Sequence, residues 1–443
     1  MTHKTRRWLY RFFILLFIIL TSYTSLYATG YQLNLRGPWR LKRLIVKTGT
    51  LAINSQPSGA SIYINDKKQS DFSWKNFNGK TLATPAKIKS LAPGEYEIRL
   101  EKDGYWPWEK RLNINAEQTT YAEDINLFKK DSILNILECG CQEIDLNPNQ
   151  RYLLLKQGKK IIDLRNNRDF KLDIKEEITS YQWLKDSDRV LINNRLFDLS
   201  TNSWTDYQEI IGPEIKNLFY DETSNRLYYQ YKDSLNYFEN NKKISQNLID
   251  KKDYSSFYLK DDRLFLLRKK GQTQVLESYN LKSHALKELS LPAGGNYSFH
   301  LGDSAWLEIF EEKSRSLFLV DPEFFMLPRE GLKNFRGGLW LQADKLLYHT
   351  DFEIYLFDLK QNTKTLMDRV GYPIKDLVWQ AKNNYLIYAT SESINSLDLS
   401  NHNSTRLLAA ENISSIFLDS KNNTLYFTAT INQKSGLYKM IVQ

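Results

Sequence analysis

The chain has 443 residues, with 26% charged and 13% aromatic side chains, 19 Gly, 11 Pro and 2 Cys. This composition excludes a disordered chain, a collagen and a protein with many membrane spans. The net charge of +9 arises from 61 Lys and Arg against 52 Asp and Glu. Because these charges are spread along the chain rather than gathered on one element, we expect no nucleic-acid partner. The abundance of aromatic and β-branched residues favours strands, so we expect an all-β fold beyond the amino-terminal segment.

The amino-terminal segment predicts a membrane anchor. Residues 8–28 contain the unbroken apolar run Phe12–Leu20, and about 20 helical residues suffice to cross a hydrocarbon layer of roughly 30 Å. A cleaved secretion signal is the alternative, but it needs small residues before the cleavage point, and the end of this segment offers them poorly. We therefore expect a cytoplasmic tail at residues 1–7, a transmembrane signal-anchor at 8–28 and a basic connector at 29–48.

Basic residues flank the anchor on both sides, so their count does not decide its orientation. They are Lys4, Arg6, Arg7 and Arg11 on one side and Arg36, Arg40, Lys42, Arg43 and Lys47 on the other. A lone hydrophobic segment near the start of a chain resembles a signal-anchor, whose short tail stays in the cytoplasm. We therefore expect a single-pass cell-membrane protein whose large carboxy-terminal region is extracytoplasmic.

Residues 49–128 predict a small β-sandwich. Apolar side chains alternate at period two in several short runs, such as Ile62 with Ile64 and Ile98 with Leu100, and this alternation is typical of half-buried strands. Turn sequences such as Pro93-Gly94 separate the runs. We expect short antiparallel strands packed in two layers.

Four strings in this region carry a family resemblance by their order and spacing: Gln56–Asp66, Thr84–Ile88, Leu91–Leu100 and Lys102–Tyr105. Together they resemble a PEGA domain. Such domains are similar to small β-sandwiches, occur mostly in prokaryotic cell-surface proteins, and often stand beside a transmembrane helix or a repeat domain. The resemblance implies no catalytic residues. An insertion at about residues 68–80 departs from the family pattern.

Aromatic residues in the sandwich are the candidate binding residues. Trp106 and Trp108 flank Pro107, and flat rings on a stiff strand suit stacking on sugars, although both rings also suit packing across the sandwich. The insertion contains Phe72, Trp74 and Phe77, which either pack in the same way or meet a membrane surface.

From residue 132 onward, a unit of roughly 40 residues recurs. Aligning the start of its second strand gives Arg151, Arg189, Arg226, Arg263, Ala305, Lys345, Tyr385 and Thr424. Four short strands in such a period predict the blade of a β-propeller. The last unit has three strands, and the lone strand Ile133–Leu137 before the first unit would supply its fourth and hide both edges. We expect a propeller over residues 132–443 with eight blades, seven being the alternative. It lacks the Gly-His and Trp-Asp pattern of WD40 repeats.

The sequence contains no catalytic constellation, and we expect neither a metal nor a cofactor. The five histidines are scattered without the spacing of a zinc site, so we expect them at turns or on the surface. For Cys139 and Cys141 we favour two thiols, with a disulfide and half of a metal site as alternatives, because a bridge across one residue is geometrically strained.

Aspartates end the third strand of several units, at Asp163, Asp198, Asp321, Asp358 and Asp398. They suggest either a ring of carboxylates or a turn that recurs in each blade. We favour the turn, because one position in each repeat usually satisfies the same backbone.

These patterns predict a prokaryotic, non-catalytic, membrane-anchored protein of the cell surface. Its propeller would present loops to an envelope glycan or to a protein partner, or would serve as an assembly scaffold. The alternative is a propeller-type hydrolase or lyase of the cell envelope, whose active residues come from different blades. A histidine or paired carboxylates with shifted pKa values at the propeller channel would favour that alternative.

Overall fold

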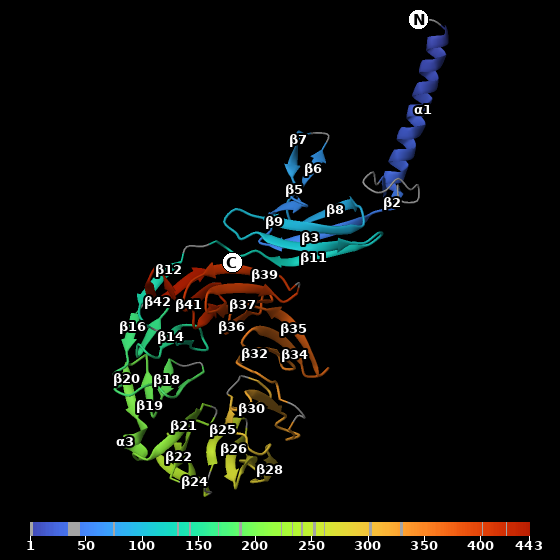
Figure 1. The fold of residues 1–443 in the computed structure, drawn as a ribbon. Helices are drawn as coiled ribbons and strands as arrows, with labels where there is room; N and C mark the ends of the chain where they lie inside the picture. The colour runs from blue at the N-terminus through green and yellow to red at the C-terminus, as the bar shows by residue number, and fades with distance from the viewer. Residues whose placement is uncertain are drawn as a thin grey trace.

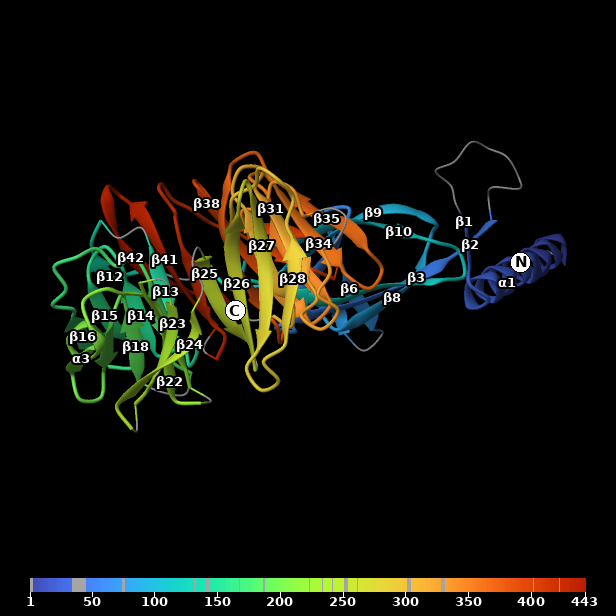
Figure 2. The same cartoon turned by 90° about the horizontal axis from the view of Figure 1, so that it is seen from below.

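The computed structural model describes residues 3–33, 45–73, 76–130, 133–140, 143–166, 168–185, 188–222, 224–232, 234–240, 242–250, 254–260, 262–300, 304–327, 331–400, 402–421 and 423–443. Three parts follow one another along the chain: a helical stem, a small β-sandwich and a ring of β-sheets (Figure 1). Seen from below, the stem and the sandwich extend to one side of the ring (Figure 2).

The stem is helix α1 (His3–Ala28). Its segment Thr5–Ala28 is long and apolar enough to cross a membrane, by length and composition. Directly after it, β1 (Tyr31–Leu33) pairs with β2 (Ile45–Lys47) in an antiparallel hairpin. Most of the predicted basic connector, residues 34–44, lies outside the described residues.

The sandwich consists of two sheets in the strand orders β10-β9-β4-β5 and β11-β3-β8, with a hairpin of β6 and β7 where the insertion was predicted. Their bounds are β3 (Gly49–Gln56), β4 (Ser61–Ile64), β5 (Lys67–Lys68), β6 (Ser70–Ser73), β7 (Asn76–Thr81), β8 (Ala86–Leu91), β9 (Gly94–Glu101), β10 (Trp108–Ile114) and β11 (Thr119–Asn126). Trp74 lies outside the described residues.

The predicted alternation accounts for the sandwich core. Ile62, Ile98 and Leu100 are fully buried between the two sheets, together with neighbours from β3 and β10. The expectation of purely antiparallel strands is wrong at one place, because β11 pairs with β3 in parallel. These are the first and last strands of the sandwich, so the intervening strands provide the crossover that a parallel pair needs.

Sheets of three or four strands make up the ring. The first four hold β13 (Ile144–Leu146), β14 (Tyr152–Leu155), β15 (Lys160–Asp163) and β16 (Arg168–Lys171); β17 (Tyr181–Trp183), β18 (Arg189–Ile192), β19 (Arg195–Asp198) and β20 (Ser203–Asp206); β21 (Ile215–Asp221), β22 (Arg226–Tyr231), β23 (Ser234–Glu239) and β24 (Ile244–Asp250); and β25 (Tyr254–Lys260), β26 (Arg263–Lys270), β27 (Thr273–Asn280) and β28 (Leu286–Ser290). A short helix, α3 (Tyr207–Ile211), follows the second sheet.

The next sheets hold β29 (Tyr297–Phe299), β30 (Leu307–Glu311) and β31 (Ser316–Val320); β32 (Gly337–Gln342), β33 (Lys345–His349), β34 (Glu353–Asp358) and β35 (Thr363–Arg369); β36 (Ile374–Gln380), β37 (Tyr385–Thr390), β38 (Ser393–Asp398) and β39 (Ser404–Ala409); and β40 (Ile416–Asp419), β41 (Thr424–Ile431) and β42 (Lys434–Ile441) with β12 (Leu134–Glu138). Among its described residues, the ring thus holds eight sheets, which we number 1 to 8 in this order.

The ring closes through strand exchange between its two ends. β12 comes before sheet 1 in sequence but pairs antiparallel with β42 of sheet 8, as expected. At the centre, β13 of sheet 1 lies against β40 of sheet 8. Within the described residues, each of eight hydrophobic clusters fills the space between two neighbouring sheets, including sheets 8 and 1. The arrangement is a closed β-propeller.

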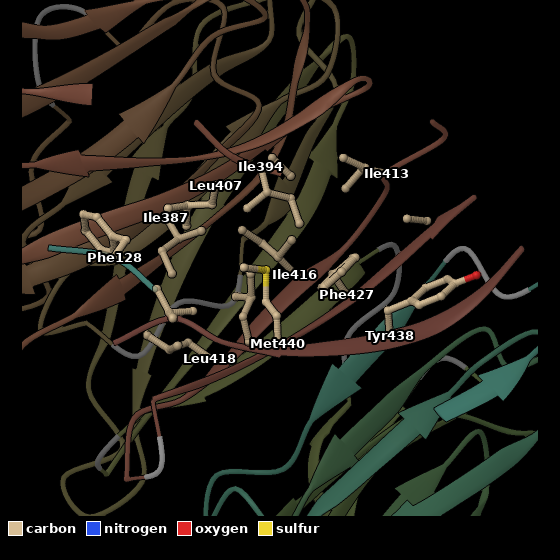
Figure 3. Packing of buried hydrophobic residues seen from close by; sticks show 14 of the residues in the cluster. Phe128, Ile387, Ile394, Leu407, Ile413, Ile416, Leu418, Phe427, Tyr438 and Met440 are labelled. Atoms are coloured by element: carbon tan, nitrogen blue, oxygen red, sulfur yellow. The ribbon is translucent and has the colours of Figure 1, made fainter. Parts of the chain in front are cut away.

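One aromatic side chain joins the sandwich to the propeller. Phe128, at the end of the sandwich, enters the cluster between sheets 7 and 8 (Figure 3). Its ring meets Tyr385 edge-on, with the ring centroids 5.0 Å apart. Next to it, the Lys129 backbone N–H donates to the Val442 carbonyl at 2.9 Å, and Asn126 Nδ2 donates to the Asn383 carbonyl at 2.9 Å. Apolar burial and backbone hydrogen bonds therefore fix the two domains together.

Candidate functional site

A broad groove crosses sheets 4, 5 and 6 on one face of the propeller. Its cavity measures about 880 Å³, which falls within the range of ~300–1,000 Å³ typical of ligand sites. The lining residues come from the turns that join first to second strands and third to fourth strands: Lys260, Asp262, Arg263, Phe265, Asn280, Ala305, Trp306, Asp321, Pro322, Glu323, Ala343, Asp344, Leu359 and Lys360. Sheets 4 and 5 lie on the far side of the ring from the sandwich (Figure 1).

The charged side chains of the groove are largely engaged with protein partners. Lys360 Nζ pairs with Asp344 Oδ2 at 2.9 Å, and Lys282 Nζ pairs with Asp262 Oδ2 at 2.5 Å. Arg263 donates to the Pro322 carbonyl. Acidic and basic groups are therefore paired along the walls of the groove, among apolar atoms that make up the larger share of its exposed lining.

Trp306 separates the groove from a smaller, apolar pocket. Its Nε1–H donates to the Ala343 carbonyl of sheet 6 at 3.1 Å, which fixes the orientation of the indole across the two sheets. The ring lines both cavities. The smaller one measures about 150 Å³, and its other lining residues are Leu317, Leu319, Leu332, Phe357, Leu359 and Asn362.

The reduced size of sheet 5 makes room for this pocket. Among the described residues, the sheet has three strands, and Leu332 forms a single bridge with Leu317 of the outer strand β31. Leu319, two residues along β31, lines the pocket instead of being covered by a fourth strand. The repeat gives no signal for this irregularity, because the interval from Ala305 to Lys345 is as long as the one that follows it.

Two carboxylates lie near the centre of the ring. Asp376 on β36 is half-buried, and its two oxygens accept backbone hydrogen bonds from Leu377 at 2.8 Å and Ile416 at 3.0 Å. Burial raises the pKa of Asp376 to about 6, with a further contribution from the charge of Asp145. Asp145 on β13 accepts a hydrogen bond from Trp183 Nε1 at 3.1 Å, and burial raises its pKa as well. Their contacts connect neighbouring sheets.

A third buried acid, Glu308, holds sheets 5 and 6 together. Glu308 is 4% exposed and accepts hydrogen bonds from Trp340 Nε1 at 2.7 Å and Ser304 Oγ at 2.9 Å. His300 Nδ1 lies 2.7 Å from its other oxygen. Burial alone would raise the pKa of Glu308, but the hydrogen bonds from His300 and Trp340 hold it below its ordinary value.

The structure places both candidate tryptophans at the junction of the two domains. Trp108 is 3% exposed and belongs to the sandwich core. The side-chain amide of Asn403 in the propeller contacts this region of the sandwich. When its nitrogen donates to the Glu109 carbonyl, its oxygen accepts from Trp108 Nε1 at 3.0 Å. Trp106 packs against the cluster between sheets 7 and 8, with Lys130 Nζ 5.1 Å from its ring centre. Packing therefore accounts for both rings, and neither lies near the groove.

Two expectations about single residues need correction. His349 lies on neither a turn nor the surface: it is 4% exposed, its Nδ1–H donates to the Thr350 carbonyl at 2.9 Å, and burial lowers its pKa. Cys139 takes part in a disulfide bond rather than remaining a thiol. Cys141 lies outside the described residues.

The aspartates at the ends of third strands accept backbone N–H groups in the following turns, as the repeat indicated. Asp198 Oδ1 accepts from Ser200 at 2.9 Å, Asp321 Oδ1 from Glu323 at 2.7 Å, and Asp358 Oδ1 from Gln361 at 3.0 Å. They stabilise turns of separate sheets. In the part of the chain that the structure describes, no group of three or more His, Cys, Asp or Glu side chains is arranged to hold a metal ion.

Comparison with known proteins identifies the sandwich. A family model described as the PEGA domain matches residues 48–129. The chain therefore carries a PEGA domain. No curated protein matches the chain.

The fold beyond the PEGA domain is similar to solved propellers. A eukaryotic initiation factor has a TM-score of 0.50 and 11% identity, covering 72% of this chain and 91% of that one. The carboxy-terminal WD40 domain of Sif2 has a TM-score of 0.46 and 13% identity, covering 70% and 98%. The Dos1 propeller has a TM-score of 0.47 and 12% identity, covering 70% and 95%. At such low identities, the likeness concerns the fold alone.

Proposed function

We propose that this protein is a membrane-anchored binding protein, whose PEGA domain and propeller form one rigid arm that holds a recognition groove away from the anchor. The observation that carries the proposal is the groove across sheets 4, 5 and 6, where turns from three sheets converge. Loops held by a rigid scaffold are the usual location of binding residues. The partner is a component of the cell envelope, and the reaction is binding without catalysis.

The junction between the domains supports this arrangement. Phe128 and the backbone hydrogen bonds around it leave the groove in a fixed place relative to the PEGA domain. Helix α1 acts as the anchor, and the large carboxy-terminal region lies outside the cytoplasm. A phosphatase that works only outside the cytoplasm, fused after Gln443, should be active in intact cells. An inactive fusion would refute this orientation.

Crosslinking in intact cells tests the binding function. A photoreactive amino acid replaces Glu323, an exposed residue of the groove, in the full-length chain. The control replaces Asn202, an exposed turn residue of sheet 2, far along the ring. We expect a discrete adduct from position 323 that position 202 does not give. Identical patterns from both positions would contradict a partner at the groove.

The pair of central carboxylates favours a second candidate, an envelope hydrolase or lyase. Asp376 and Asp145 have raised pKa values, and such shifts are typical of acid and base catalysts. Against this candidate, both oxygens of Asp376 are engaged by backbone N–H groups that join strands. Turnover of envelope glycan by the full-length chain, abolished in Asp376→Asn, would establish the enzyme. A chain that binds without turnover would exclude this role for the pair.

A further inference from the structure

The groove is lined by charged as well as apolar side chains, whereas no charged side chain lines the adjoining pocket, and together they indicate what they bind. The charged side chains of the groove carry no large excess of one sign, because Asp262 and Asp344 each pair with a lysine. A strongly charged ligand would have to break these pairs. A neutral ligand with many hydroxyl groups has no such requirement, since paired carboxylates and ammonium groups still accept and donate further hydrogen bonds.

Trp306, which lines both cavities, is suited to stacking on a sugar ring. Trp306 presents a rigid aromatic surface that is held in place through Ala343. An indole offers a large apolar face at low entropic cost, and the C–H face of a pyranose is a flat apolar surface of matching kind. Carboxylate and ammonium groups stand on the groove side of the ring, where the hydroxyl groups of the same sugar would point.

The pocket next to Trp306 is too small for a whole ligand. Its volume of about 150 Å³ lies below the ~300–1,000 Å³ of sites that enclose a small molecule, so it takes a substituent. Leucine and phenylalanine side chains line it, which suits a methyl group, and Asn362 adds one amide. An apolar lining with an amide at its edge matches an acetamido group, whose methyl is apolar and whose N–H and C=O need partners.

We propose that the groove binds a neutral oligosaccharide of N-acetylated amino sugars, with a pyranose on Trp306 and one acetamido group in the pocket beside Asn362. The inference rests on the proposed binding function and names its ligand. A peptide partner is the alternative outcome of the test.

Two oligosaccharides that differ at one substituent provide the test. Tetra-N-acetylchitotetraose and cellotetraose share their backbone, but only the first carries acetamido groups. Calorimetry measures both with the full-length chain in a detergent that has no sugar head group. We expect the acetylated tetramer to bind at least tenfold more tightly, because an unfilled acetamido site leaves polar and apolar contacts unmade.

Matched variants locate the effect. Asn362 and Asn202 occupy the same position in the turns Asp358–Thr363 and Asp198–Ser203, and both have positive φ, at 49° and 53°. Asn362→Asp should bring the ratio of the two affinities to about one, whereas Asn202→Asp should leave it unchanged. Trp306→Phe, which keeps a ring but removes the indole N–H, should weaken both ligands about equally.

Each outcome has a definite meaning. Equal affinity for the two tetramers, or a preference that survives Asn362→Asp, would overturn the assignment of the acetamido pocket. If neither tetramer binds while position 323 crosslinks to a protein in cells, the glycan inference fails and the binding function stands. If crosslinking also fails, the proposed function fails with it.

Discussion

Replacing Asp376 with Asn should change how the stability of the protein depends on pH. Burial raises the pKa of Asp376 from 3.8 to about 6, a difference of about two units, and each unit corresponds to ~1.4 kcal/mol. Well below pH 4 the carboxyl is protonated in both the folded and the unfolded chain and makes no difference. As the pH rises from about 4 to about 6, the unfolded chain ionises this group more easily than the folded chain, so up to about 3 kcal/mol of stability is lost.

The amide side chain introduced by Asp376→Asn does not titrate, so the variant lacks this loss. Its Oδ1 can still accept from Leu377, but its Nδ2 faces the Ile416 N–H, and this mismatch costs roughly 1 kcal/mol at every pH. We therefore expect Asp376→Asn to be less stable than the unaltered chain at pH 4 and more stable at pH 8. The difference between the two proteins should change by about 2.5 kcal/mol over this range.

Urea unfolding of the full-length chain in detergent, followed by tryptophan fluorescence at pH 4, 5, 6, 7 and 8, measures this difference. Asp173→Asn makes the same chemical change at an exposed carboxylate, so it is the control for lost surface charge. If the Asp376→Asn and unaltered curves stay parallel over this pH range, the reasoning about the buried carboxyl is refuted.

Three further substitutions test the packing of the ring. In Gly436→Ala, the new Cβ would lie 2.3 Å from the Leu137 carbonyl oxygen, so closure by β12 should weaken by ~1–3 kcal/mol; an unchanged melting temperature would contradict the close pairing. Phe128→Ala should cost ~3–5 kcal/mol of domain attachment, seen as faster proteolysis between sandwich and propeller, and an unchanged cleavage rate would refute its role there. Trp340→Phe removes a hydrogen bond to the buried Glu308 carboxylate and should cost ~1.5–3 kcal/mol at pH 7, an effect that would be absent if the indole only filled space.

The repeat predicted the propeller well because its signal is local. The second strand of each unit is a short, fully buried apolar run after a polar turn, and its start falls within two residues of the predicted position in every repeat. Arg189, Arg226 and Lys345, for instance, begin β18, β22 and β33 as expected. The lone strand before sheet 1 was recognisable for the same reason, since the last unit lacked a strand and the first was preceded by one.

The sequence pattern could not predict features that depend on contacts between segments far apart in the chain. The groove draws Arg263, Trp306 and Asp344 from turns of three sheets, and nothing local marks a turn as part of a shared cavity. The aromatic pair Trp106 and Trp108 gave a signal for stacking, but the signal is the same for a domain interface. Burial of His349 also depends on its neighbours in space rather than on its place in the repeat.

The place where the sandwich meets the propeller determines how the molecule responds to tension. Phe128 inserts beside sheet 8, and β12, the strand that completes that sheet, begins six residues later in the sequence, at Leu134. A force applied to the membrane stem would first act on Phe128 and its contacts. It would then act on the paired strands β12 and β42, where several hydrogen bonds share the force. Sheet 8 therefore closes the ring and also receives the force from the stem, so unfolding under tension would begin with the separation of β12 from β42.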